Sequence, residues 1–136
     1  MALVTAGSLS GCLGRPGPLT ETPTPTSTWE DDVEFGEEVD EAVFVEASSY
    51  EFTPGSDDPI EVSHGATVGI AMLSTDNGYH AGHGLAIDHY QVNLSALVDQ
   101  VDTVVFDADT AGEFHVWCSV PCSDGHHGMT GTFIVR

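Results

Sequence analysis

From residue 42 onward, apolar residues occur in short runs that alternate with polar residues and are separated by Gly, Pro, Asp and Ser. Runs of this kind are typical of β-strands with one buried side. No segment keeps a helical spacing of apolar residues over several turns. We expect strands at residues 43–46, 50–52, 60–62, 67–73, 85–87, 91–94, 103–106, 114–117 and 132–135. Regularly spaced short strands without helices predict an all-β fold, a β-sandwich with one modest core, over residues 42–136.

The first 12 residues are mostly small and apolar and end in Leu9-Ser10-Gly11-Cys12. This ending resembles a lipoprotein signal, in which the cysteine becomes the lipidated first residue of the mature chain. The basic residues expected near the start of a signal peptide are missing before Cys12. The alternative is a disordered N-terminus with an incidental cysteine. We favour lipidation, because Cys12 stands apart from the other two cysteines and an exposed thiol is a liability.

Residues 13–41 combine a Pro- and Thr-rich segment with a run of acidic residues. Neither composition can bury a core, and like charges at this density repel one another. We therefore expect a linker, a disordered stalk that precedes the folded domain. No window approaches the ~20 consecutive apolar residues of a transmembrane helix, so lipid on Cys12 would be the membrane anchor. An ordinary flexible tail would differ only in lacking this lipid.

The chain has 22 acidic residues, two arginines and no lysine, for a formal net charge of -20. Such a charge excludes nucleic-acid binding, which requires a basic surface. An acidic surface can steer a basic partner. It can also adapt a halophilic protein to high salt, where screening reduces its self-repulsion. Because lysine is missing from the whole chain, we favour the adaptation to high salt.

Four side chains near the C-terminus have the chemistry of metal ligands. Cys118, Cys122, His126 and Met129 form a Cys-x3-Cys-x3-His-x2-Met pattern within twelve residues. Thiolates and thioethers are soft ligands, and imidazole also suits copper, whereas calcium and magnesium prefer oxygen ligands. Zinc binds cysteine and histidine but has little use for methionine. The pattern therefore favours copper.

A loop this short cannot surround a metal alone, and His83, thirty-five residues before Cys118, is the expected further ligand. Together with His83, the pattern resembles the copper-binding domain of cytochrome c oxidase subunit II, which is shared with nitrous oxide reductase. The resemblance covers about residues 50–135. It implies a cupredoxin-like Greek-key β-sandwich that carries a binuclear CuA centre.

The resemblance also implies a role for each ligand. His83 and His126 would each cap one copper, and Cys118 and Cys122 would bridge the coppers through sulfur. The Met129 thioether and the Val120 backbone carbonyl would be weak ligands. The family usually has Glu or Gln where Val120 stands, but only the carbonyl binds, so we expect the site to survive. Family members also begin with one or two transmembrane helices, which this sequence lacks.

The function that the resemblance implies is one-electron transfer without bond chemistry. The donor would be a small redox carrier, a cytochrome c or a blue-copper protein, and the acceptor the catalytic subunit of a haem–copper oxidase. The domain would lie at the extracytoplasmic face of the cell membrane, anchored by lipid. As such a subunit it would serve as the electron entry of an oxidoreductase, and the sequence shows no nucleophile–base pair, phosphate-binding loop or cofactor fingerprint.

Three alternatives compete with the two-copper centre. A Cys118–Cys122 disulfide is compatible with an extracytoplasmic location, but it leaves His83, His126 and Met129 unexplained. A mononuclear blue-copper electron carrier would use one cysteine, two histidines and an axial methionine, and would not need Cys118. A copper-delivery protein of the thioredoxin-like kind also carries Cys-x3-Cys and a histidine, but it lacks the following His-x2-Met and alternates strands with helices.

The remaining histidines are expected to lie at the surface. His80 and His127 are close in sequence to His83 and His126, and only the spacing of the family selects between them. His115 alternates with apolar residues of a strand and should face solvent. Trp117, directly before Cys118, is expected in the core or at its rim.

Overall fold

The computed structural model describes residues 28–48, 51–75, 82–120 and 129–136. The chain divides into two compact units, Met1–Asp32 and Val33–Arg136. In the first unit, Trp29–Asp32 forms the short 3₁₀ helix η3, and the Thr28 amide donates a hydrogen bond to the Asp31 carboxylate (3.2 Å). The second unit contains all of the strands described below. Cys12 and the Pro- and Thr-rich segment lie outside the described residues, so the lipid anchor and the stalk stay predictions.

The described part of the second unit consists of strands and their connections. The strands are β1 Glu41–Ser48, β2 Glu51–Thr53, β3 Ile60–Val62, β4 Thr67–Ser74, β5 Gly82–Ile87, β6 Val92–Leu97, β7 Val101–Asp107, β8 Gly112–Trp117 and β9 Thr130–Val135. Each segment expected to be a strand overlaps one of them. No helix in the described residues is long and apolar enough to cross a membrane.

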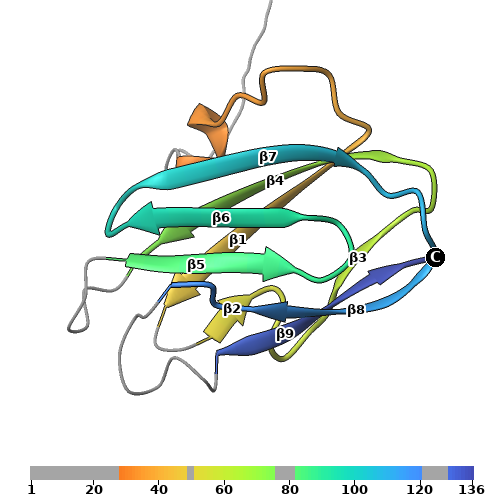
Figure 1. Cartoon of the computed structure of the whole chain (residues 1–136). Helices are drawn as coiled ribbons and strands as arrows, with labels where there is room; N and C mark the ends of the chain where they lie inside the picture. The colour runs from red at the N-terminus through yellow and green to blue at the C-terminus, as the bar shows by residue number, and fades with distance from the viewer. Residues whose placement is uncertain (1–27, 49–50, 76–81, 121–128) are drawn as a thin grey trace, which may run out of the picture. The chain divides into compact units, whose positions relative to one another are not determined.

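The strands form two sheets that pack as a sandwich (Figure 1). One sheet has the order β2-β1-β4-β7 and the other the order β3-β9-β8-β5-β6. The pairs β1–β4 and β3–β9 are parallel, whereas the remaining neighbours are antiparallel. The predicted all-β sandwich is therefore confirmed.

The core lies between the two sheets and is built by alternation along the strands. In β6, Val92, Leu94 and Ala96 are buried, whereas the residues between them are exposed. This is the period of two that a strand with one buried side requires. The first sheet contributes Val68, Ile70 and Met72 of β4 to the same core, and the second adds Leu85, Val116 and Phe133.

Residues 33–40, which precede β1, belong to the same compact unit as the strands. Phe35 is the reason, because its ring lies against β4 at Gly69 and its centroid is 6.4 Å from that of Phe44. A Cβ atom built on Gly69 would stand 2.8 Å from the Phe35 ring, so the glycine makes room for it. Asp40 then joins the sheet through its backbone amide, which donates to the Thr67 carbonyl (2.8 Å). The end of the acidic run thus packs on the sandwich.

The hairpin of β8 and β9 is the element that positions the metal-ligand candidates. These strands pair antiparallel from Gly112↔Val135 to Trp117↔Thr130. One residue beyond the last pair, the Cys118 amide donates a hydrogen bond to the Met129 carbonyl (3.1 Å). This hairpin brings Cys118 and Met129 side by side although ten residues separate them.

Candidate metal centre

Three of the predicted ligands lie among the described residues as buried side chains of the second sheet. Cys118 directly follows β8, Met129 directly precedes β9, and His83 is the second residue of β5. Their exposed fractions are 2% for Cys118, 0% for Met129 and 4% for His83. Cysteine and methionine are often buried, but a histidine in the interior is less usual and needs a chemical reason.

The strand pattern explains why these side chains point inward. In β5, His83 alternates with Leu85 and Ile87, both of which belong to the core between the sheets. In β8, Cys118 continues the alternation that begins with the buried Val116. Because residues two apart share one face of a strand, the imidazole and the thiol are both directed to the inner face.

The register between β5 and β8 brings His83 close to the cysteine loop. Ala86 pairs with Trp117 and Ile87 with Val116. The same antiparallel register, continued past the end of β8, places Gly84 opposite Ser119 and His83 opposite Val120. A Cβ atom built on Gly84 would clash with the Ser119 side chain and stand 3.1 Å from the Ser119 and Val120 amide nitrogens, which shows how close this approach is.

Two described groups, the Gly84 amide and the Val120 carbonyl, form hydrogen bonds with the Cys118 sulfur. The Gly84 amide donates to the sulfur across 3.4 Å, and the thiol donates to the Val120 carbonyl across 3.2 Å. The Val120 carbonyl oxygen was predicted as a weak ligand, and it lies beside the sulfur predicted to bridge the metals. The described structure thus gathers an imidazole, a thiol, a thioether and a carbonyl at one end of the sandwich.

This donor set fits copper. Sulfur and imidazole donors held in an apolar, water-poor setting suit a soft metal, and a hard cation would require carboxylate oxygens instead. Among the described residues, no group of three or more His, Cys, Asp or Glu side chains gathers into a cluster. Cys122 and His126, which would complete such a cluster, lie in residues 121–128, outside the described part of the chain. Their roles as ligands stay predictions.

The other described histidines lie away from these donors. His115 is exposed on β8, as expected. His64 is exposed and makes a hydrogen bond to the Asp109 carbonyl (3.2 Å). His89 is exposed in the turn after β5 and stacks on Phe114 at 5.1 Å between ring centroids. His80 and His127 fall outside the described residues.

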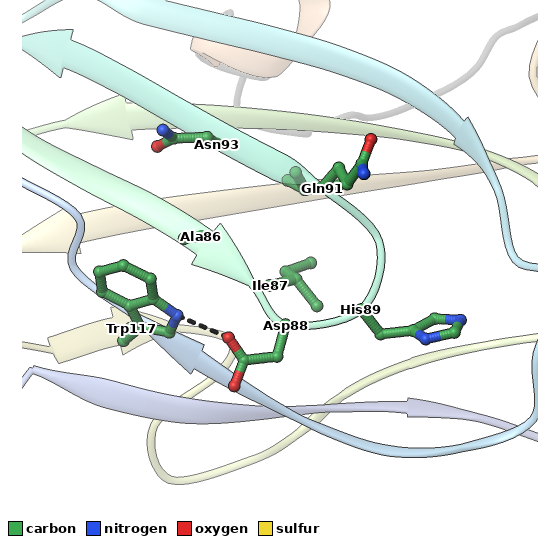
Figure 2. A pocket seen from close by; sticks show the side chains of 8 residues that line it. Ala86, Ile87, Asp88, His89, Gln91, Asn93 and Trp117 are labelled. Carbon is green, nitrogen blue, oxygen red and sulfur yellow. Dashed lines mark hydrogen bonds between the residues drawn. The ribbon is translucent and has the colours of Figure 1, made fainter.

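On the outer face of the same sheet, the two residues that flank Cys118 each form a side-chain hydrogen bond. The Trp117 indole N–H donates to the Asp88 carboxylate (3.0 Å), as Figure 2 shows, and the Ser119 hydroxyl donates to the Asn93 amide oxygen (2.7 Å). Trp117 is 38% exposed, so it lies at the surface and not in the core. An open hollow is lined by Trp117, Asp88 and Asn93 among others, on the opposite face from the buried donors.

Gly84, Asp88, Asn93 and Ser119 are not among the residues predicted from the sequence to belong to the site. Two features of the sequence could have indicated some of these residues. An isolated glycine inside a strand pattern, such as Gly84 in β5, often marks a close approach of another backbone. Trp117 and Ser119 flank an inward-facing cysteine, and alternation directs both of them outward.

The fold and the buried donors define a class of protein, the cupredoxin-like domains. The structure superposes with a TM-score of 0.64 on the crystal structure of the periplasmic domain of subunit II of cytochrome oxidase of Bradyrhizobium japonicum, at 15% identity over 75% of this chain and 88% of that one. It also resembles a chain of a haem–copper terminal oxidase dimer solved by cryo-EM, with a TM-score of 0.59 and 25% identity over 85% of this chain and 80% of that one. No protein-family model matches the sequence.

The sequence itself is similar to a named protein of this class. It is 31% identical over 94 residues to cytochrome c oxidase subunit 2 of Thermus thermophilus, a match that covers 69% of this chain and 64% of that relative. The chain therefore spans somewhat less than two thirds of the length of this relative. The predicted resemblance to cytochrome c oxidase subunit II is confirmed, and the chain contains a cupredoxin-like domain similar to that subunit.

Proposed function

We propose that this chain is a CuA-type electron-transfer domain that holds two copper ions. The ligands would be His83, Cys118, Cys122, His126, Met129 and the carbonyl of Val120. The observation that carries the proposal is that His83, Cys118 and Met129 are buried at the end of the sandwich where the Cys118 thiol bonds to the Val120 carbonyl. Similarity to a cytochrome c oxidase subunit 2 supports the same conclusion.

The role of the chain is to hold the donor atoms in one geometry. When bound, the copper pair would supply reversible one-electron chemistry. Cys118 and Met129 are fixed to each other by the hairpin of β8 and β9, and Gly84 of β5 donates an amide hydrogen bond to the Cys118 sulfur. Hydrogen bonds to a metal-bound sulfur orient the ligand and tune the metal. A rigid ligand frame keeps geometry changes on reduction small, which favours fast electron transfer.

The bridging role of Cys118 separates this proposal from a mononuclear blue-copper site. The test is to load the purified chain with copper, count the ions and record an electron paramagnetic resonance spectrum. We expect two coppers per chain and an unpaired electron shared between them. Cys118→Ser should abolish this spectrum and leave at most one copper. Cys12→Ser, the same exchange at the cysteine outside the loop, should leave both coppers in place.

One copper per wild-type chain with a blue-copper spectrum would show that the mononuclear alternative is right. A thioredoxin-like delivery protein is a poorer candidate, because the described residues fold as strands without the alternating helices of that class.

The proposed partners are a small redox carrier as donor and the catalytic subunit of a haem–copper oxidase as acceptor. The similar protein of Thermus thermophilus is named as an oxidase subunit, and a similar chain belongs to a haem–copper terminal oxidase. The Bradyrhizobium japonicum domain is periplasmic, which supports an extracytoplasmic location, with lipid on Cys12 as the proposed anchor.

Purification of the native chain from solubilised membranes at high salt tests the partner. A haem-containing subunit should co-purify with it. A chain that exchanges electrons with membranes, yet never purifies with haem, would be a free-standing carrier.

A further inference from the structure

The two residues that flank Cys118 are each tied to a side chain on the outer face of the sheet. Trp117 donates to Asp88, in the turn after β5, and Ser119 donates to Asn93 of β6. We call these two hydrogen-bonded pairs the outer clamp. Figure 2 shows the first pair, with Asn93 on the same face. Asp88 and Asn93 belong to neither the predicted ligands nor the core.

The clamp lies where the backbone ladder between β5 and β8 ends. The paired residues of these strands are Ala86↔Trp117 and Ile87↔Val116, and β8 itself ends at Trp117. The side-chain bonds of Trp117 and Ser119 therefore hold the chain at and beyond the last pair of this ladder. With Trp117 and Ser119 held outward, alternation leaves only the inward direction for the side chain of Cys118.

Gly84 connects the clamp to the sulfur. Any side chain at this position would meet the Ser119 hydroxyl, so the glycine makes room for the second pair of the clamp. The Gly84 amide also donates to the Cys118 sulfur (3.4 Å). A shift of Ser119 away from Asn93 would therefore change the distance between this amide and the sulfur.

We propose that Asp88 and Asn93 are positioning residues for the Cys118 sulfur. They act through Trp117 and Ser119, and they fix the direction of the sulfur toward the Gly84 amide and the Val120 carbonyl. The effect on bound copper rests on the proposed function, whereas the effect on the sulfur itself does not. Both pairs are exposed. The alternative to a positioning role is therefore that they act only as two ordinary surface hydrogen bonds.

The first test uses the copper-free protein and measures hydrogen exchange of the Gly84 amide. In the double variant Asp88→Ala/Asn93→Ala, this amide should exchange about tenfold faster than in the wild type, since two modest hydrogen bonds that restrain it are lost. Amides in the middle of β4, on the other sheet, should keep their exchange rates. Each single variant should give a smaller increase, and either can replace the double variant if that chain folds poorly.

Two controls separate positioning from general destabilisation. Asp88→Asn and Asn93→Asp keep an acceptor oxygen at each position and should restore slow exchange at Gly84. Thr67→Val removes a comparable exposed bond, from the Thr67 hydroxyl to the Asp107 carboxylate (3.1 Å), on the other sheet. This variant should leave the Gly84 amide unchanged.

The second test uses the copper-loaded protein. The double variant should lose copper to a chelator about tenfold faster than the wild type and show a shifted reduction potential, while the variants that keep an acceptor should match the wild type. If the wild type holds no copper pair, the proposed function fails, and the copper-free measurement still decides whether the clamp positions the sulfur. Wild-type exchange at Gly84 in the double variant would overturn the inference.

Discussion

The two ends of the sandwich are closed by different kinds of side chain. Strand β8 runs from the first end toward the second (Figure 1). Phe114 is its third residue, and Cys118 directly follows its last residue. At the first end, which we call the aromatic end, the rings of Tyr90, Phe114 and Phe133 lie 5.1 to 6.4 Å apart between centroids. At the other end, the donor end, Cys118, Met129 and His83 are buried instead.

The difference separates what folding requires from what function requires. The aromatic end packs large rings together, and the Tyr90 hydroxyl among them is satisfied, because it exchanges hydrogen bonds with the backbone of Thr110. Packing alone accounts for this end. The donor end buries an imidazole where an apolar side chain would pack at lower cost. The proposed metal site is a chemical reason for His83 to stand there.

The largest effect on stability is expected at the aromatic end. Phe133 is fully buried and contacts rings from three other segments. Phe133→Ala should lower the free energy of unfolding of the copper-free protein by about 3–5 kcal/mol, because the lost contacts leave a cavity. Chemical denaturation measures this loss, and Phe133→Leu, which fills part of the volume, should lose less. Folded Phe133→Leu protein should still bind two coppers, and a lower copper count would show that the two ends are not independent.

A substitution at the donor end should separate stability from redox chemistry. Met129→Leu nearly conserves volume in a fully buried position, so the copper-free protein should lose at most about 1.5 kcal/mol. Both coppers should remain bound, and the reduction potential should shift, because the thioether is proposed as a weak ligand. Denaturation, copper analysis and voltammetry on one preparation test all three points. Loss of both coppers from the folded variant would contradict the weak-ligand role.

A smaller effect is expected where the aromatic end meets the backbone. Tyr90→Phe keeps the ring and removes only the hydroxyl that bonds to Thr110. The free energy of unfolding should fall by about 1 kcal/mol, the net contribution of a typical hydrogen bond. The measurement is again chemical denaturation, with copper binding as a second observable. A changed reduction potential in this variant would mean that the aromatic end reaches the donor end after all.

The strands and part of the site could be predicted from local signals. The alternation of Val92, Leu94 and Ala96 marks a strand without any knowledge of its partners. Cys118 and Met129 meet because one hairpin joins them, so their spacing alone placed them together. His83 was harder, since it lies thirty-five residues earlier and was selected through the resemblance to a family. The acidic side chains before β1 are exposed, as expected, but Phe35 among them packs its ring against the sheet, which the charge pattern did not indicate.

The sequence by itself determined the chemistry of the donors and the inward or outward direction of side chains along each strand, because both depend on neighbouring residues alone. Only the tertiary structure decided which strands pair. The short turn after β3 carries the chain from one sheet to the other. In the second sheet, β5 lies beside β8. That pairing sets Gly84 against Cys118 and brings Asp88 and Asn93 behind it. Such contacts depend on hydrogen bonds between segments far apart in the chain, and outside a hairpin such as β8–β9 no local pattern encodes the partner of a strand.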